Sequence, residues 1–364
     1  RNSCSIICWS ACRRSPEHAP SPSAMDAIAG KPLCRAPYFY RLESTHYLLI
    51  ESIMIQANPR VIVQEVGLRD GLQSVAQTMS TEDKIRWIDA AYQSGIRHME
   101  IASFIPPGLL PQMADAATVV AYAKRYADLT VTALVPNEKG AVNAIAAGAN
   151  RIVAPISVSV AHSLANVRRT PDDMVAEFSR IRACLDRENS SVTLIAGLST
   201  VFGCTLQGVV TARAVCDIVR KCLDAGADVI ALADTTGHAT PLQVGQVIED
   251  VKNIAGPKLT SMHFHDTRGM GLPNTLVALE HGIREFDASL AGLGGCPHAP
   301  GATGNVVTED LVFMLESMGY ATGVDLEKLI ASRHILQEAL PDEPLYGFIA
   351  RAGIPETYPL SPVQ

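Results

Sequence analysis

Hydrophobic positions from residue 60 onward alternate between two patterns. Short runs rich in β-branched residues are separated by longer stretches whose apolar residues recur at the spacing of an amphipathic helix. The predicted strands cover residues 61–66, 98–102, 129–135, 151–156, 192–196, 229–233, 259–265 and 285–290. The predicted helices cover residues 81–94, 111–127, 138–147, 171–187, 207–225, 241–254 and 273–282, and two more cover 303–319 and 325–338.

This alternation predicts an α/β protein with a parallel sheet. Eight strands favour a closed (β/α)8 TIM barrel with extra C-terminal helices. The alternative is an open doubly wound sheet, which would lead us to expect a Gly-x-Gly-x-x-Gly turn after an early strand. The sequence has no such turn there. We therefore expect one barrel domain over residues 54–364.

Residues 1–53 have a different composition from the rest of the chain. Ser, Cys, Pro and Arg are common there, acidic residues are scarce, and no clear periodicity is present. One interpretation is a transit peptide. The other is upstream sequence that does not belong to the working protein, with Met54 as its natural start. Under either interpretation, we expect a poorly structured N-terminal arm.

The overall composition argues against several classes of partner. The 364 residues carry a formal net charge of −7, so no basic surface for nucleic acid or for an anionic membrane is indicated. No uninterrupted apolar run reaches the roughly 18 residues of a membrane span. The nine cysteines are odd in number and form no Cys-x-x-Cys pair, which favours free thiols in a reducing compartment.

Polar residues gather where the predicted strands end. They are Arg69 and Asp70 after the first strand, Glu100 on the second, Asp234 after the sixth, His263 and His265 on the seventh, and Cys296 and Asn305 after the eighth. In a barrel, the carboxyl ends of all strands open at one mouth, which carries the active site. The spacing predicts that these side chains converge there.

The strongest indication of a metal site is the pair His263 and His265. Residues i and i+2 of a strand point to the same face, so both imidazoles are expected to face the barrel axis. With the oxygens of Asp70 and Asn305, they form a mixed nitrogen and oxygen set without thiolates. Such a set suits Mg²⁺ or Mn²⁺ with open positions for substrate. The alternative is two core histidines bonded to their neighbours.

Two further residues suggest the reaction. Arg69, between Gly67 and Gly71, could stabilise a developing enolate oxygen, although a plain surface ion pair is the alternative. Cys296, in a loop rich in Gly and Pro, could transfer a proton, or could simply be a small buried residue; His298 is a weak candidate for its partner. None of the predicted strands contains the Lys that imine chemistry needs, which favours metal-assisted carbon–carbon chemistry.

Three motifs resemble the 3-hydroxy-3-methylglutaryl-CoA lyase family, which belongs to a superfamily of metal-dependent lyases built on a (β/α)8 barrel. They are GLGGCPHAPGATGN at 292–305, EVGLRDGLQ at 65–73 and HFHDTRG at 263–269. They occur in the family's order, and the resemblance runs from about residue 60 to residue 340.

The resemblance implies a role for each matching residue. Asp70, His263, His265 and Asn305 would hold the divalent cation, Arg69 would stabilise the enolate of acetyl-CoA, and Cys296 would transfer a proton. Glu100 is counted with these catalytic residues, and the supporting residues would be Gln73, Asp234 and Glu309. The implied reaction is a retro-Claisen cleavage that yields acetyl-CoA and acetoacetate.

Several positions depart from the family pattern. Arg268 and His298 stand where the family usually has Tyr, residues 108–110 replace a usual Lys-Trp pair, and residues 197–200 lack a usual Ser-Cys. The acyl-recognition surface is therefore expected to differ. We hypothesise that the lyase prefers a related 3-hydroxyacyl-CoA of the methylmalyl- or citramalyl-CoA type, with Arg268 contacting the altered acyl chain.

The acyl-CoA substrate also needs cations for its phosphates. Lys139, Arg168 and Arg169 are the candidates, with ordinary solvated charge as the alternative for each. A homodimer in the cytoplasm is expected from the family likeness, with the mitochondrial matrix as the alternative location. Two other functions stay open: a condensing acyltransferase of the same superfamily, and a metal-binding barrel without catalysis.

Overall fold

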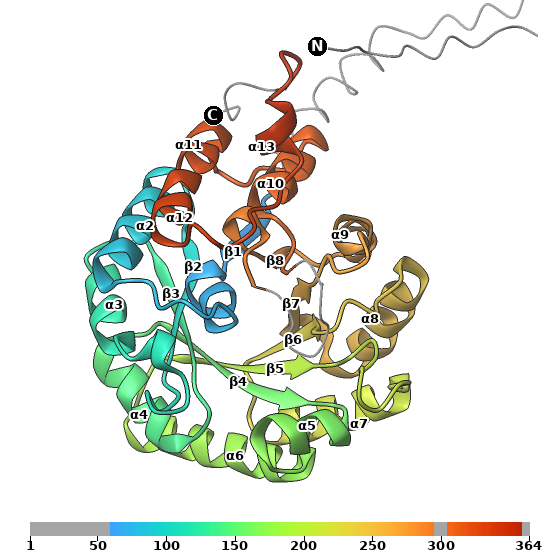
Figure 1. The fold of residues 1–364 in the computed structure, drawn as a ribbon. Coiled ribbons are helices and arrows are strands. Elements are labelled where there is room, and N and C mark those ends of the chain that lie inside the picture. The colour runs from blue at the N-terminus through green and yellow to red at the C-terminus, as the bar shows by residue number, and fades with distance from the viewer. Residues whose placement is uncertain (1–58, 295–303, 359–364) are drawn as a thin grey trace, which may run out of the picture. The chain divides into compact units, whose positions relative to one another are not determined.

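The structure, a computed structural model, describes residues 59–294 and 304–358. Within them, eight parallel strands follow one another around a closed barrel, and β1 pairs with β8 (Figure 1). The strands are β1 Ile62–Glu65, β2 His98–Ser103, β3 Thr130–Leu134, β4 Arg151–Ser157, β5 Thr193–Ser199, β6 Val229–Asp234, β7 Leu259–Phe264 and β8 Glu285–Ala288. All eight predicted strands are present, so the predicted TIM barrel is confirmed and the open sheet is excluded.

Helices form a ring outside the strands (Figure 1). They are α2 Thr81–Gln93, α3 Ala116–Ala123, α4 Glu138–Ala147, α5 Val160–Val167, α6 Pro171–Arg187, α7 Ala212–Asp224, α8 Pro241–Ala255, α9 Gly271–Glu280, α10 Thr308–Ser317, α11 Leu326–Ala331, α12 Arg333–Ala339 and α13 Ile349–Ala352. The predicted extra C-terminal helices are therefore present, and α11 and α12 pack on α2. The predicted arm, residues 1–53, lies outside the described residues.

The sequence pattern missed α5. Residues 157–160 alternate Ser and Val, as in a strand, and they directly continue β4. The backbone turns into a helix instead because the hydroxyl of Ser159 accepts a hydrogen bond from the amide of His162 at 3.1 Å. Such a cap satisfies one of the free amides at a helix start and stabilises it by about 1 kcal/mol.

Other differences concern where helices begin. The predicted helix 207–225 starts only at residue 212, because Thr211 caps α7 and Gly208 pairs with Cys204 in a short bridge. The predicted helix 111–127 divides into a 3-10 turn, Pro111–Met113, and α3. A π-helical turn, η1 Gly67–Gly71, follows β1 where a loop was expected.

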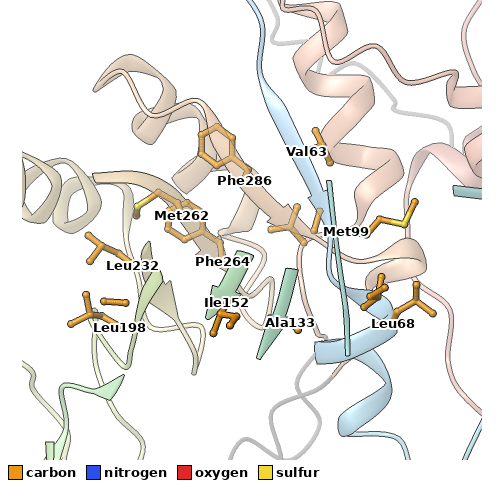
Figure 2. Close-up of a cluster of buried hydrophobic side chains, with 14 of the residues drawn as sticks. Val63, Leu68, Met99, Ala133, Ile152, Leu198, Leu232, Met262, Phe264 and Phe286 are labelled. Atoms are coloured by element: carbon orange, nitrogen blue, oxygen red, sulfur yellow. The ribbon is translucent and has the colours of Figure 1, made fainter. Parts of the chain in front are cut away.

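The two faces of the strands differ in chemistry. Apolar residues such as Val63, Met99, Ile152 and Phe286 are buried (Figure 2). Polar residues on the other face bond across the barrel interior between strands that are not neighbours: Arg151 of β4 pairs with Glu285 of β8 at 2.5 Å. Because side chains alternate between the faces of a strand, the polar face must line the barrel axis and the apolar face must pack on the helices.

A cavity of about 970 Å³ lies at the amino-terminal end of the barrel, lined by the first residues of the strands, including His98, Arg151 and Glu285. It is opposite the strand ends that carry the polar motifs. None of the helices within residues 59–294 and 304–358 is both long and apolar enough to cross a membrane.

Candidate metal centre and active site

Three potential metal ligands meet at the carboxyl ends of the strands. Asp70 comes from the turn η1 after β1, His263 lies on β7, and His265 directly follows β7. One ligand atom from each residue lies within 4.8 Å of the others. The imidazole rings of His263 and His265 are 5.0 Å apart between centroids, so the two side chains do share one face.

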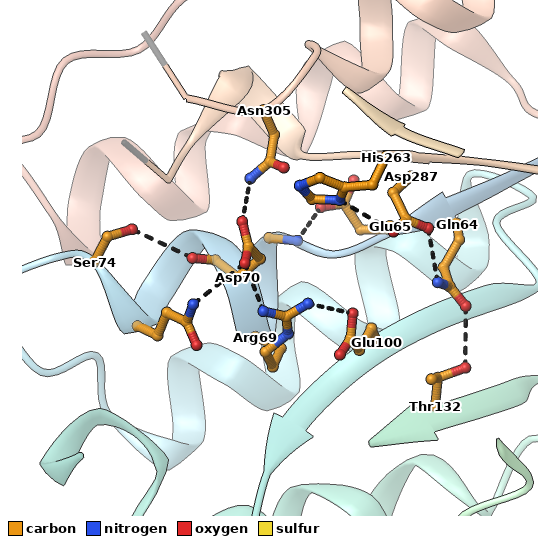
Figure 3. A network of polar contacts seen from close by, with 12 residues as sticks. Gln64, Glu65, Arg69, Asp70, Ser74, Glu100, Thr132, His263, Asp287 and Asn305 are labelled. Atoms are coloured by element: carbon orange, nitrogen blue, oxygen red, sulfur yellow. Dashed lines mark hydrogen bonds and ion pairs between the residues drawn. The ribbon is translucent and has the colours of Figure 1, made fainter. Parts of the chain in front are cut away.

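The fourth predicted ligand, Asn305, lies beside this group and forms a backbone bridge with His265. Its amide nitrogen donates to Asp70 Oδ2 at 2.9 Å (Figure 3). It also donates to the carbonyl of Leu293 at 3.1 Å. Its Oδ1 atom is buried and has no hydrogen-bond partner among the described residues.

These atoms fit a divalent cation. The Nε2 atom of His265 lies 3.8 Å from Asp70 Oδ2, and its Nδ1 atom is also buried without a partner in the described part of the chain. Asn305 Oδ1 and His265 Nδ1 are therefore two buried polar atoms without a described partner beside the group Asp70, His263 and His265, and unsatisfied buried polar atoms of this kind are uncommon in folded proteins. A cation that prefers nitrogen and oxygen ligands would satisfy them.

The Arg69 side chain lies between two carboxylates. It donates to Asp70 Oδ1 at 2.5 Å and to Glu100 Oε2 at 2.7 Å (Figure 3). Burial alone would raise the pKa of Asp70, but the charge of Arg69, together with His265 and His263, holds this pKa well below its usual range. Asp70 is therefore anionic at neutral pH, as a metal ligand must be.

Glu100 is almost completely buried, at 1% exposure, and burial raises its pKa even though Arg69 opposes the shift. Its second oxygen, Oε1, has no partner among the described residues. The amide of Gln73 donates to Asp70 Oδ1 at 3.2 Å, so it braces the same carboxylate as Arg69. The structure thus brings Arg69, Asp70, Gln73 and Glu100 together, and the roles that the resemblance implies for them stay predictions.

Sequence reasoning missed two residues of this network. Asp287 on β8 accepts from Nδ1 of His263 at 3.1 Å, and Gln64 on β1 donates to Asp287 at 2.8 Å (Figure 3). Burial would lower the pKa of His263, but the hydrogen bond to Asp287 and the charge of Asp70 raise it. The sequence signal that could have identified them is a polar residue among the predicted inward-facing positions, Asp287 on β8 and Gln64 on β1.

Asp234 and Glu309, both predicted supporting residues, hold loops in place. The carboxylate of Asp234 accepts from the amides of His238 at 2.8 Å and Ala239 at 3.1 Å, which fixes the loop after β6. Glu309 accepts from the amide of Ala291 and from Arg333. Burial raises the pKa of both carboxyls. Neither has a described contact with the ligand group.

A third buried carboxylate, Glu65, joins β1 to the segment after β8. It accepts from the amides of Gly67 at 2.8 Å and Leu290 at 3.0 Å, and from the hydroxyl of Thr308 at 2.7 Å. Burial raises its pKa from 4.5 to about 7, against these hydrogen bonds. Glu65 therefore ties together the turn that carries Asp70 and the segment that leads to Asn305.

The four predicted substrate-binding cations follow three strands: Lys139 follows β3, Arg168 and Arg169 follow β4, and Arg268 follows β7. Arg268 is exposed and donates to the carbonyls of Thr236 at 3.1 Å and Gly237 at 2.7 Å. Arg169 pairs with Glu177 at 3.0 Å. Lys139 is exposed on α4, and Arg168 ends α5 with a left-handed backbone. No described contact joins any of the four to the ligand group.

Cys296 and His298 lie outside the described residues, and the flanking glycines show where their segment begins and ends. Gly294 lies against Asp70, and a Cβ atom on Gly294 would be 3.2 Å from the Asp70 carbonyl oxygen. Gly304 packs on Gly294 so closely that an added Cβ atom would lie 2.1 Å from the Gly294 carbonyl oxygen. Gly294 and Gly304, the described residues on either side, therefore lie next to the ligand group.

Comparison with known proteins identifies the family. Residues 60–336 match the family described as HMGL-like. The hydroxymethylglutaryl-CoA lyase YngG of Bacillus subtilis (strain 168) is 38% identical over 281 residues, 77% of this chain and 93% of the relative. The mitochondrial hydroxymethylglutaryl-CoA lyase of Macaca fascicularis is also 38% identical over 281 residues, 77% of this chain and 86% of the relative.

A solved structure agrees with these relatives. The HMG-CoA lyase from Acenitobacter baumannii, in complex with coenzyme A and 3-methylmalate, superposes with a TM-score of 0.77. The two sequences are 39% identical, and the match covers 82% of this chain and 96% of that chain. With the barrel and the ligand group already in place, these likenesses lead to one conclusion: the chain belongs to the HMGL-like family.

Proposed function

We propose that this protein is a carbon–carbon lyase that cleaves 3-hydroxy-3-methylglutaryl-CoA to acetyl-CoA and acetoacetate. The observation that carries the proposal is the group Asp70, His263 and His265 beside Arg69, at the carboxyl ends of the strands in an HMGL-like barrel. Asp70, His263, His265 and Asn305 would hold Mg²⁺ or Mn²⁺. The bound cation would polarise the 3-hydroxyl and carbonyl oxygens of the substrate.

We assign the proton transfers and the stabilisation of the enolate to residues of the chain itself. We assign Glu100 to accept the proton of the 3-hydroxyl group, because its Oε1 atom has no partner among the described residues and burial raises its pKa. The O–H electron pair becomes the new carbonyl bond at C3. The C2–C3 bond breaks, and its electron pair passes to C2 and the thioester carbonyl as the enolate of acetyl-CoA.

Arg69 is our candidate for stabilising that enolate oxygen. Its guanidinium remains charged at every working pH, and Asp70 and Glu100 fix its orientation before substrate arrives. Cys296 is proposed to give a proton to C2, which completes acetyl-CoA. It follows Gly294 by two residues, and Gly294 lies against Asp70.

A specific observation favours an alternative substrate with a different acyl group. The lyase structure with coenzyme A also contains 3-methylmalate, the acid of a methylmalyl-type thioester. In this chain, Arg268 is exposed on the segment after β7, where a carboxylate of the acyl group could meet it. The second candidate function is therefore cleavage of a methylmalyl- or citramalyl-type thioester by the same residues. We further propose that Lys139, Arg168 and Arg169 contribute positive charge for the phosphates of coenzyme A.

The experiment that tests the proposal measures the release of acetyl-CoA from hydroxymethylglutaryl-CoA in the presence of Mg²⁺. The wild type and His263→Ala are compared, each with and without EDTA. Release that EDTA and the variant both abolish supports the lyase. Faster cleavage of a citramalyl-type thioester to acetyl-CoA, or of a methylmalyl-type thioester to propionyl-CoA, would change the substrate and keep the mechanism. No release from any of these thioesters would contradict the proposal.

We also propose that the protein works as a homodimer in the cytoplasm, with the mitochondrial matrix as the alternative. The similarity to both a bacterial and a mitochondrial lyase leaves both compartments open. Light scattering of the purified chain tests the dimer. Fractionation of cells that express the complete natural protein tests the compartment.

A further inference from the structure

The contacts of His263 lead to an inference that rests on the proposed metal site and goes beyond it. The Nδ1 atom of its ring is 3.1 Å from Asp287 Oδ2. An ionised carboxylate can only accept, so Nδ1 must carry the proton and donate it. In the neutral ring this leaves Nε2 unprotonated and able to bind a cation. We propose that Asp287 is the positioning residue that presents Nε2 of His263 to the group with Asp70 and His265.

Asp287 is itself held by a second layer of contacts inside the barrel. The side-chain amide of Gln64 donates to Asp287 Oδ1 at 2.8 Å, and the hydroxyl of Thr132 donates to Gln64 Oε1 at 3.0 Å. The Thr132 bond fixes which end of the Gln64 amide faces Asp287. This series of hydrogen bonds, from Thr132 through Gln64 and Asp287 to His263, joins β3, β1, β8 and β7 across the barrel (Figure 3). Gln64 and Thr132 are buried.

The structure places Asp287 behind His263 and outside the ligand group. Each of its oxygens already accepts from a described donor, His263 for Oδ2 and Gln64 for Oδ1. Asp287 is also not among the residues whose ligand atoms converge, which are Asp70, His263 and His265. Because its oxygens lie outside this convergent group, Asp287 is assigned to orient His263 and not to hold the cation. A partner that orients a metal-binding imidazole typically changes metal affinity 10–100-fold when it is removed.

The test measures Mn²⁺ binding to the full chain by electron paramagnetic resonance, at a temperature where every variant is folded. We expect Asp287→Ala to weaken binding by about 10–100-fold. Asp287→Asn keeps an oxygen that can accept from Nδ1, so it should retain most of the affinity. Gln64→Leu leaves Asp287 in place without its brace and should give an intermediate loss.

The matched control is Glu285→Gln. Glu285 lies two residues before Asp287 on the same face of β8, and it forms the ion pair with Arg151 at the opposite end of the barrel. This variant should lower the melting temperature without changing Mn²⁺ affinity. A purely structural role for Asp287 would give the same result for Asp287→Ala.

A second readout needs no metal. Nitrogen-15 NMR of labelled histidines in the metal-free protein, recorded at a pH where the His263 ring is neutral, should show His263 protonated on Nδ1 in the wild type. In Asp287→Ala it should show a mixture of tautomers. Mn²⁺ affinity within twofold of wild type in Asp287→Ala, or an equal loss in Glu285→Gln, would overturn the inference. If the wild type itself bound no Mn²⁺, the proposed metal site would fail first, and this inference with it.

Discussion

The guanidinium of Arg69 donates to Glu100 at 2.7 Å, and both side chains are buried in the mouth of the barrel. This contact joins the turn after β1 to β2, and it fixes the direction in which Arg69 can approach a substrate. A buried pair of this kind is costly to break on one side only, because the remaining charge loses its partner.

We expect Arg69→Met to lower the rate constant for acetyl-CoA release by about 10²–10³-fold, because a donor to the enolate oxygen is lost. Arg69→Lys keeps the charge without the forked geometry and should fall between this variant and the wild type. Turnover at saturating substrate and Mg²⁺ measures the effect, with thermal unfolding as the control for folding. Turnover of Arg69→Met within tenfold of wild type would rule out this role.

The buried carboxyl of Glu65 predicts a specific dependence of stability on pH. Its pKa is about 7 in the folded protein and near 4.5 in the unfolded chain. The folded state therefore binds this proton more tightly. The resulting stabilisation is fully present below pH 4.5 and is lost as the pH rises through 7.

Glu65→Gln should remove this contribution, because the amide oxygen can still accept from Gly67 and Leu290. Between pH 5 and pH 8, the free energy of unfolding of the variant should improve relative to wild type by on the order of 2 kcal/mol. Urea unfolding across this range checks the prediction. Parallel pH profiles for the two proteins would show that Glu65 does not titrate as described.

Mn²⁺ should stabilise the wild type against heat. A ligand at 100 times its dissociation constant contributes about 2.7 kcal/mol, which for a chain of this size raises the melting temperature by about 5 °C. Asn305→Ala should lose most of this shift because Oδ1 is a proposed ligand. Differential scanning fluorimetry with EDTA or Mn²⁺ measures it.

The control for this prediction is Asn274→Ala, which removes another buried Asn whose Oδ1 atom lacks a described partner. It lies on α9, and its amide donates to the Ala239 carbonyl at 3.1 Å. This variant should melt at a lower temperature and still gain the full shift from Mn²⁺. Equal shifts for both variants would remove Asn305 from the ligand set.

Gly304→Ala should disrupt the site by steric conflict alone. The added methyl group would lie 2.1 Å from the carbonyl oxygen of Gly294, and backbone on both sides leaves it little room to move. We expect the variant to lose at least roughly 2 kcal/mol of stability, which is a typical cost of overpacking. If the backbone shifts to relieve the conflict, we expect loss of Mn²⁺ binding instead. Gly108→Ala is the control, because its Cβ atom would meet nothing within 4 Å. A variant Gly304→Ala with wild-type melting and metal binding would contradict the described packing.

Local sequence patterns were enough to predict the barrel and the meeting of Asp70, His263 and His265. Each strand is a run that the pattern of apolar residues identifies by itself, and the shared face of His263 and His265 follows from the two-residue repeat of a strand. The relation between Asp70 and these histidines required one additional assumption, that strand ends converge at one mouth.

Other features depend on how neighbouring strands are shifted along one another, which the sequence does not display. Asp287 meets His263 because of the register between β8 and β7, in which these two residues are direct partners. Gln64 meets Thr132 across an intervening strand. The helix α5 was missed because Ser and Val alternate at its start, and only the cap at Ser159 stops the strand there.

The alternation of faces on β8 also limits how this enzyme can change. Phe286 packs towards the helices, and its neighbour Asp287 points to the barrel axis. A substitution at an inward position can alter the chemistry and leave the apolar layer intact. Deleting or inserting a single residue in the strand would exchange the two faces, because the side-chain period is two. We therefore expect strand length to be nearly invariant in functional variants, while the inward positions can be varied separately.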